Sequence, residues 1–124
     1  MITGVGIDIV EVKRMERWLN NSSLLERYFH SEEIALAYAR KNSAALTLSA
    51  RFAAKEAFGK ALGTGLAQLA LKDIMVLNRE NGKPYILLTG TAQKAFESSG
   101  ANRMHISLSH ERDNAIAIII LERA

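Results

Sequence analysis

The chain has 124 residues, of which 48% are apolar and 23% are charged, as expected for one globular domain that buries about two-thirds of its extended surface. It contains no cysteine, which excludes disulfides and thiolate chemistry, and no apolar run long enough to span a bilayer. Its net charge of +3 is too small to indicate nucleic-acid binding, and its N-terminus lacks a signal-peptide pattern, so we expect one cytoplasmic domain over residues 1–124.

Alternation of side chains predicts a strand over residues 2–10. One face carries Val5, Ile7 and Ile9, and the other carries Gly4, Gly6 and Asp8. Glycines inside a strand mark the close approach of another backbone or of a ligand, so Asp8 is expected at the strand end, on the side cleared of side chains. Two interpretations of Asp8 stay open: it belongs to a site, or it caps the following helix.

Residues 11–19 have the apolar spacing of a helix. An adjoining exposed face carries Lys13, Arg14 and Arg17. Positive charge near a helix start opposes the helix dipole, so these residues do not stabilise the helix itself. They form either a docking surface for an acidic protein or a solubilising face.

A turn at residues 20–23 precedes a short helical turn at 24–28. Ser31 is then predicted to cap a helix whose charge order, Glu32 and Glu33 first and Arg40 and Lys41 last, agrees with the dipole.

The main helix is predicted over residues 43–62, with Gly63 ending it. Half of it is rich in alanine and can pack closely against another element. The opposite half carries Arg51, Phe52, Lys55, Glu56, Gly59 and Lys60. Glu56 and Lys60 have the spacing of an ion pair, whereas Arg51 and Lys55 repel each other. This face suits an external anion, although an ordinary solvated face is the alternative.

Two hairpins and a short helix are predicted for the second half of the chain. Strands at 74–77 and 85–88 flank Asn81-Gly82, a helix follows at 92–99, and strands at 104–110 and 115–121 end the chain. The last strand is apolar on both faces, which fits the middle of a sheet or a sheet face covered by another subunit. The fold class is therefore α+β, a small mixed domain with an antiparallel sheet packed against a long central helix.

Chemistry-bearing residues occur in three of these elements. The strand at 104–110 places His105, Ser107 and Ser109 on one face, either as donors for phosphate oxygens or as an exposed polar face. Magnesium is commonly held by one or two carboxylates plus substrate phosphates, and Asp8 and Glu56 are suitable ligands. Together with the helix cations, these residues indicate a site for a metal-bridged diphosphate.

The chain resembles the holo-[acyl-carrier-protein] synthase family of 4′-phosphopantetheinyl transferases. The matching motifs, in family order, are Gly6-Ile7-Asp8 with Arg14; Arg51-Phe52-Ala53-Ala54-Lys55-Glu56-Ala57-Phe58 with Lys60; Gly63-Thr64-Gly65; Asn81-Gly82-Lys83-Pro84; and His105-Ile106-Ser107-Leu108-Ser109-His110. They span essentially the whole chain.

This resemblance implies transfer of phosphopantetheine from coenzyme A to a serine of acyl carrier protein, releasing adenosine 3′,5′-bisphosphate and supporting fatty acid biosynthesis. It implies a homotrimer with sites between subunits, and no nucleic acid or membrane partner. Asp8 and Glu56 match the Mg²⁺ ligands, and Lys60 a lysine near the diphosphate. Further matching positions are Arg51, Gly63, His105 and Ser107 for the cofactor and Lys13, Arg14 and Arg17 for the carrier protein. The serine proton passes to Glu56 or to a metal-bound water.

Two other functions use the same residues. A magnesium-dependent hydrolase of nucleoside diphosphate compounds would use the same acids with water as nucleophile, but the chain lacks the multi-glutamate helix typical of such enzymes. A non-catalytic module would hold an acidic partner or RNA on its basic faces, and its binding would depend on salt and not on magnesium.

Overall fold

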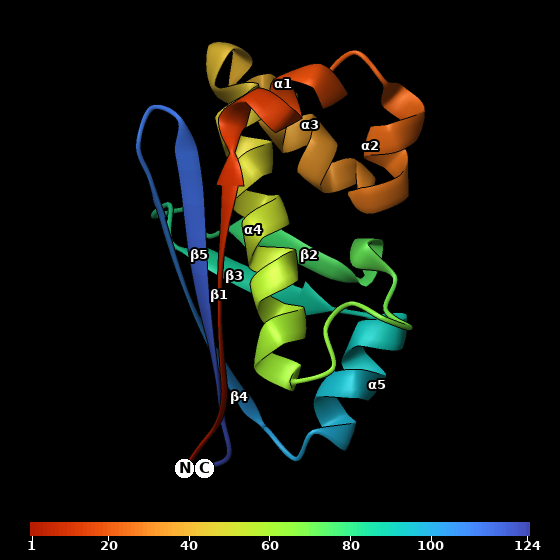
Figure 1. The fold of residues 1–124 in the computed structure, drawn as a ribbon, viewed down its shortest axis with the longest axis vertical. Coiled ribbons are helices and arrows are strands. Elements are labelled where there is room, and N and C mark those ends of the chain that lie inside the picture. The colour runs from red at the N-terminus through yellow and green to blue at the C-terminus, as the bar shows by residue number, and fades with distance from the viewer.

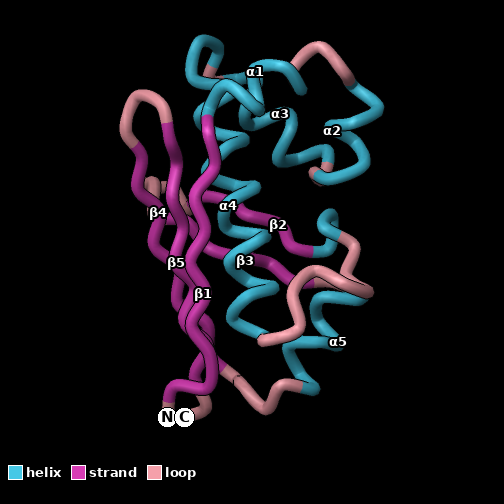
Figure 2. Tube along the Cα trace, in the orientation of Figure 1, coloured by secondary structure: helices cyan, strands magenta, loops and turns pink.

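In the computed structural model, which describes residues 1–124, a long helix lies at the centre with other elements around it (Figure 1). The helices are α1 (Val12–Trp18), α2 (Ser22–Tyr28), α3 (Ser31–Ala39), the central α4 (Ala44–Leu62) and α5 (Gly90–Ser98), with 3-10 turns at Lys41–Ser43 and Leu71–Asp73. The strands are β1 (Ile2–Glu11), β2 (Ile74–Asn78), β3 (Pro84–Leu88), β4 (Arg103–His110) and β5 (Asn114–Glu122). Both termini lie at one end of the sheet (Figure 2).

The strands form two antiparallel sheets, where the sequence analysis expected one. Three strands pair in the order β1-β5-β4, and β2 pairs only with β3. The predicted α+β class and the predicted hairpins are confirmed, and β5 is the central strand, as its two apolar faces indicated. The three-stranded sheet covers one side of α4, whereas the β2–β3 hairpin and the group α1–α3 cover others (Figure 1).

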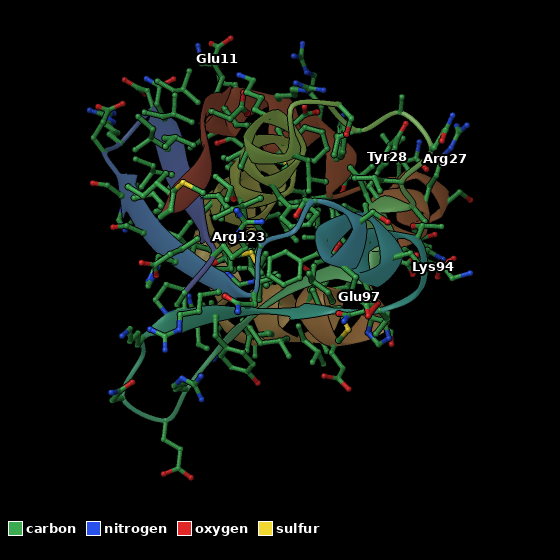
Figure 3. The ribbon with its side chains drawn as sticks, turned by 90° about the horizontal axis from the view of Figure 1, so that it is seen from below. Glu11, Arg27, Tyr28, Lys94, Glu97 and Arg123 are labelled. Atoms are coloured by element: carbon green, nitrogen blue, oxygen red, sulfur yellow. The ribbon has the colours of Figure 1, made fainter.

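This arrangement buries α4 on nearly all sides, which the view along its axis makes visible (Figure 3). One exposed half of this helix was expected from the sequence, and this expectation was wrong for most of its residues. Arg51, Phe52 and Lys55 are all buried, while Glu56 is partly buried and Lys60 exposed. A helix enclosed by three structural layers keeps little solvated surface, so its buried polar side chains must find partners inside the protein.

Lys55 illustrates the consequence. Its Nζ donates hydrogen bonds to Glu33 Oε1 at 2.8 Å and to the carbonyl oxygens of Leu71 and Ile74, and both charged side chains are fully buried. The second carboxylate oxygen of Glu33 accepts from the backbone N–H of Val76. Lys55 is therefore a structural residue that joins α3, α4 and β2, and it is not part of an anion-binding face.

The N-terminus of α3 is capped by His30 and not by Ser31 as predicted. His30 Nδ1 accepts from the backbone N–H of Glu32, while the Glu33 carboxylate accepts from the backbone N–H of His30. The reciprocal pair satisfies two helix-terminal donors. Because the same Glu33 holds Lys55, the cap also fixes the buried ion pair.

The glycines of β1 allow the strand to lie directly on α4. A Cβ at Gly6 would overlap the carbonyl oxygen of Ala57, and one at Gly4 would overlap that of Ala61. The sequence-based expectation of a close approach at these glycines is confirmed, and the partner is the backbone of α4. Asp8 lies two residues further along the same face of β1, so its side chain also points toward α4.

The outer face of the three-stranded sheet is largely apolar. Its cross-strand rows are Val5–Ile120–His105, Ile7–Ile118–Ser107 and Ile9–Ile116–Ser109. The β1 members are more than half exposed, at 55%, 53% and 62%. Contiguous apolar patches of this kind are uncommon on monomers and mark interaction surfaces. None of the helices is long and apolar enough to cross a membrane.

Replacement of Gly6 by alanine is expected to lower the free energy of unfolding by at least about 2 kcal/mol, because β1 must move away from α4 to make room for the methyl group. Urea unfolding followed by circular dichroism measures this change. Thr3→Ala, at an exposed position of the same strand, is the matched control and should change stability by less than about 0.5 kcal/mol. Equal stabilities for the two variants would contradict the close packing.

Candidate active site

The packing of β1 on α4 brings Asp8 next to two charged residues of the helix. Lys60 Nζ lies 3.0 Å from Asp8 Oδ1 and donates a second hydrogen bond to the carbonyl oxygen of Ile7, also at 3.0 Å. The Asp8 side chain is 18% exposed and the Lys60 side chain 53%. The interpretation of Asp8 as a helix cap is wrong, because β1 continues to Glu11 and no side chain caps α1. The expected Glu56–Lys60 pair is replaced by Asp8–Lys60.

Glu56 is the second carboxylate of this group. Partial burial raises the pKa of Glu56, and the negative charge of Asp8 raises it further, while the cations Arg14 and Lys60 act in the opposite direction. Because the Asp8 charge acts on Glu56, we assign the two carboxylates to one acid group. Only Asp8 has a direct ion-pair partner, so Glu56 keeps acceptor capacity for a ligand.

The first helix borders this acid group. The Arg14 guanidinium lies 5.0 Å from the ring centre of Phe52 and 5.3 Å from that of Trp18, a stacking that holds it beside Glu56. Lys13 and Arg17 of the same helix are exposed to solvent. The predicted basic face of α1 therefore exists, and it adjoins the carboxylates.

The acid group has the chemistry of a partial magnesium site. Two carboxylates supply oxygen ligands, but no three His, Cys, Asp or Glu side chains of the chain are grouped so that they could hold a metal. Mg²⁺ is usually bound by one or two carboxylates, with water and substrate phosphates as the other ligands. Asp8 and Glu56 fit this mode, in which the substrate is needed to complete the coordination.

A second, basic group lies on the other side of α4. Residues of four elements line a cleft of about 810 Å³. These elements are the C-terminal end of α3, the helix α4, the β2–β3 hairpin and the strand β4. Its polar and charged lining residues are Arg40, Ser43, Thr47, Arg51, Asn78, Lys83, Ser107 and His110. No carboxylate lines it. We call it the basic cleft.

Arg51 is the buried base of this cleft. Burial lowers the pKa of Arg51 to about 10, and the like charge of Arg40 contributes to the decrease. Both guanidinium groups donate to Asn78 Oδ1, and the buried Arg51 Nε has no hydrogen-bond partner. An anion in the cleft would relieve the repulsion between the two guanidinium groups and satisfy unused donors.

The acid group and the basic cleft lie at opposite edges of the same sheet. Asp8 is on β1 and Ser107 is on β4, and β5 separates these two edge strands. None of Asp8, Glu56 and Lys60 lines the basic cleft. The predicted site residues are thus brought together as two groups and not as one.

The remaining predicted residues have more varied positions. His105 lies on the outer face of β4, where its Nε2 is 2.9 Å from Glu122 Oε1, and it does not line the basic cleft. Gly63 ends α4 in the left-handed conformation, with φ at +84°, as its sequence position predicted. Asn78 was not predicted from the sequence, and Arg40 was expected only at a helix end. The cations of the cleft, Arg40, Arg51 and Lys83, come from distant elements and therefore form no local sequence pattern. Lys83 was part of a family motif, Asn81-Gly82-Lys83-Pro84.

The sequence profile of the 4′-phosphopantetheinyl transferase superfamily matches residues 4–119. The chain belongs to this family.

Curated relatives and solved structures agree with the assignment. The holo-[acyl-carrier-protein] synthase of Treponema denticola is 53% identical over 122 residues, which are 98% of this chain and 99% of the relative. The holo-(acyl-carrier-protein) synthase of Bacillus anthracis, solved in complex with CoA (3′,5′-ADP), is 35% identical with a TM-score of 0.82, covering 100% of this chain and 99% of the other. The Helicobacter pylori enzyme in complex with coenzyme A is 30% identical with a TM-score of 0.80, covering 95% and 99%. The family is one of transferases, so the resemblance predicted from motifs is confirmed.

Glu56→Gln is expected to raise the free energy of unfolding at pH 7.5 by less than about 1 kcal/mol, because solvent screens this partly buried carboxyl. The folded state raises the pKa of Glu56, so wild-type stability relative to the glutamine variant falls as pH rises through the folded pKa. Below pH 4.5, the ordinary pKa of a glutamate, Glu56 is protonated in both the folded and the unfolded state. The difference in stability between the wild type and the glutamine variant should then vanish. Urea unfolding at both pH values tests this.

The control for that comparison is Glu97→Gln, an exposed carboxylate that projects from α5 (Figure 3). It should show no pH-dependent difference from the wild type. A loss of stability in Glu56→Gln at pH 7.5 would contradict the charge arrangement described above.

Proposed function

We propose that the chain transfers the 4′-phosphopantetheine group of coenzyme A to a serine hydroxyl of apo acyl carrier protein in a Mg²⁺-dependent reaction. The observation that carries the proposal is the basic cleft, in which buried Arg51 and neighbouring Arg40 stand without a carboxylate. Such a cleft suits the phosphates of a nucleotide. The names of the relatives and the coenzyme A complexes of the structural neighbours support coenzyme A as this nucleotide.

Phosphoryl transfer depends on positioning and on neutralisation of charge. The serine oxygen forms a bond to the phosphorus that carries pantetheine, and the bond from that phosphorus to the bridging oxygen breaks. The bridging oxygen leaves with adenosine 3′,5′-bisphosphate. Asp8 and Glu56 would hold Mg²⁺, which when bound neutralises charge on the diphosphate oxygens.

The side chains of the acid group have separate tasks in this proposal. Lys60 extends from α4 beside Asp8 and is half exposed, so its ammonium group can reach a diphosphate oxygen or the leaving oxygen. Glu56, which has no direct ion-pair partner in the chain, is the residue that we assign to accept the proton of the serine hydroxyl. The basic cleft binds the nucleotide part, with Arg51, Ser107 and Lys83 as donors to its oxygens.

The two groups are brought together in this proposal by association of copies. The apolar outer face of the sheet lies between the acid group and the basic cleft, so packing of these faces can set the acids of one copy beside the cleft of the next. A contact between two different surfaces is heterologous, and it forms a ring when the rotation from copy to copy closes. The resemblance gives the number of copies as three, with His105 of one copy facing the site of its neighbour.

The basic face of α1 is the proposed docking surface for acyl carrier protein. Lys13 and Arg17 are exposed, and Arg14 is held beside Glu56, so an acidic partner bound there has its serine near the acid group. Opposite charges on two surfaces mainly increase the rate of encounter. The product, holo acyl carrier protein, would serve fatty acid biosynthesis. A cytoplasmic location of the chain stays a prediction.

The central test is intact-mass measurement of a carrier protein incubated with the chain, coenzyme A and Mg²⁺. We expect the mass of one phosphopantetheine group to be added, and its loss when Mg²⁺ is chelated. Asp8→Asn and Glu56→Gln should each lower the rate by at least about 100-fold with the fold retained, whereas Glu97→Gln should not. Release of free phosphopantetheine without a carrier would instead indicate the hydrolase alternative.

Charge reversal on α1 tests the docking surface. Lys13→Glu with Arg17→Glu should raise KM for the carrier protein about tenfold at low salt and leave KM for coenzyme A unchanged, because only the protein partner contacts α1. Lys94→Glu on α5 is the control, since Lys94 points away from the site (Figure 3). An unchanged KM in the double variant would exclude this surface.

Association is tested by placing a charge in the middle of the apolar face. Ile118→Asp should give monomers in sedimentation velocity and abolish transfer, because Ile118 is the centre of the central cross-strand row. Leu87→Asp, which introduces the same charge at an exposed leucine of the other sheet, should leave both properties unchanged. A variant at Ile118 that stays associated would show that the face is not the interface.

A further inference from the structure

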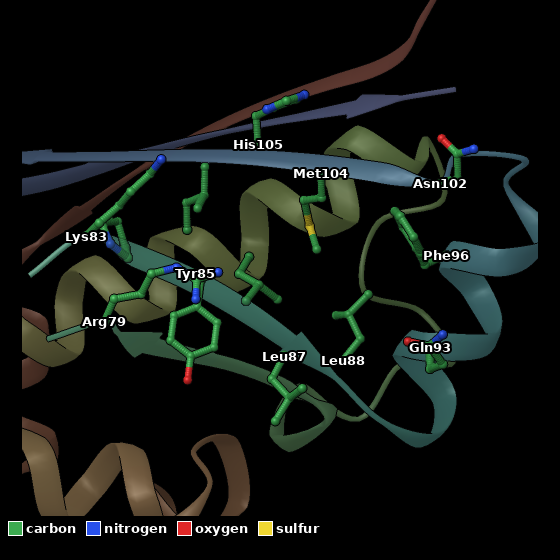
Figure 4. A pocket seen from close by; sticks show the side chains of 13 residues that line it. Arg79, Lys83, Tyr85, Leu87, Leu88, Gln93, Phe96, Asn102, Met104 and His105 are labelled. Carbon is green, nitrogen blue, oxygen red and sulfur yellow. The ribbon is translucent and has the colours of Figure 1, made fainter. Parts of the chain in front are cut away.

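A groove between the two sheets adjoins the basic cleft, and most of its side chains have no task in the proposed reaction. β3 and β4 are edge strands of different sheets, and they run past each other beside α5. The groove between them has a volume of about 510 Å³, a size typical of small-molecule sites. Figure 4 shows Met104, Leu88 and Phe96 converging in it. His105 is at its border, and its side chain projects from the opposite side of β4. The groove therefore opens away from the apolar outer face of the sheet.

The lining of the groove changes in character from one end to the other. The cations Arg79 and Lys83 lie at the hairpin end, and apolar side chains follow toward α5 (Figure 4). No carboxylate lines the groove. The Arg79 guanidinium lies 4.6 Å from the ring centre of Tyr85 and has no salt-bridge partner, so its charge is positioned but not neutralised.

The apolar residues of the groove are only half buried. Leu88, Phe96 and Met104 pack against the core on one side and keep part of their surface in the groove. From Pro84 to Leu88, β3 advances about 13 Å, roughly the length of an extended ten-carbon chain. A ligand that covers this surface and reaches the cations has a chain of this length with a negative head.

From this arrangement we infer that the groove between β3, β4 and α5 binds an anionic amphiphile of about ten carbons, with its head at Arg79 and Lys83 and its chain over Leu88, Met104 and Phe96. A carboxylate and a phosphate monoester provide the same head chemistry. The groove shares Lys83, Pro84 and Ile106 with the basic cleft but not Arg51. The inference concerns binding alone and does not depend on the proposed transfer.

Isothermal titration calorimetry tests the inference with decanoate and decyl phosphate, both below their micelle-forming concentrations. We expect each to bind with a Kd below about 1 mM. Decyltrimethylammonium, which has the same chain and a positive head, should bind at least about tenfold more weakly, as should inorganic phosphate, which has no chain. Comparison of the two anions identifies the preferred head. Equal binding of the cationic amphiphile, or absence of binding, would overturn the inference.

Variants locate the two ends of the ligand. Arg79→Gln should weaken decanoate binding about fivefold, whereas Arg112→Gln, which removes an exposed charge from the β4–β5 turn, should have less than about a twofold effect. Gln93→Trp adds an indole at the exposed far end and should weaken decanoate more than octanoate. Identical effects of the two arginine variants would contradict the proposed head position.

Amide chemical shifts provide the location directly. Decanoate should shift the signals of residues 86–88, 96 and 104 in a ¹H–¹⁵N spectrum of the wild type. The same signals should shift in the spectrum of the Arg79→Gln variant, at a higher ligand concentration. Shifts confined to β1 and β5 would place the ligand on the apolar outer face and reject the groove.

Discussion

The direct packing of β1 on α4 is the contact on which the rest of the structure depends. Gly6 lies on Ala57 and Gly4 on Ala61, so each step of two strand residues corresponds to one turn of the helix. The two distances are similar because two strand residues advance about 6.6 Å and four helical residues about 6.0 Å. Continued by one step, this register pairs Asp8 with Ala53, and Glu56 lies in the turn of α4 between Ala53 and Ala57. The long Lys60 side chain reaches Asp8 from the next turn of the helix. The acid group is therefore a product of close backbone packing, and side chains in place of the glycines would separate its two halves.

The two buried cations of α4, Lys55 and Arg51, differ in whether their hydrogen-bond donors find partners inside the protein. Lys55 finds Glu33 and two carbonyl oxygens, and all its donors are satisfied inside the protein. Arg51 shares one amide oxygen with Arg40, and its Nε remains without a partner. In our proposal, the two buried cations of this helix therefore have different roles, with Lys55 in structure and Arg51 in binding. The distinction follows from whether a carboxylate reaches the cation, because a buried charge without one favours an incoming anion.

The sheet separates the two groups of functional residues. Its central strand lies between the acid group at β1 and the basic cleft at β4, and its outer face is apolar on two of three strands. A single chain therefore carries two parts of a site and the surface that could join them. Burial of that surface and completion of the site are coupled in our proposal, so association and activity would depend on the same strands.

Much of the fold was determined locally by the sequence. Alternation predicted β1 and β4, and a run apolar on both faces predicted β5. The Asn81-Gly82 turn predicted the β2–β3 hairpin, and Gly63 predicted the end of α4, because backbone conformation at these positions depends on near neighbours. The family and the pair of carboxylates also followed from motifs. Only the tertiary structure decided that Lys55 is internal, that Lys60 pairs with Asp8, and that Arg40 and Asn78 complete a cleft around Arg51. A helical wheel assigns one face to solvent, but α4 is covered by layers from both ends of the chain, and no local pattern records which distant side chain will meet each cation.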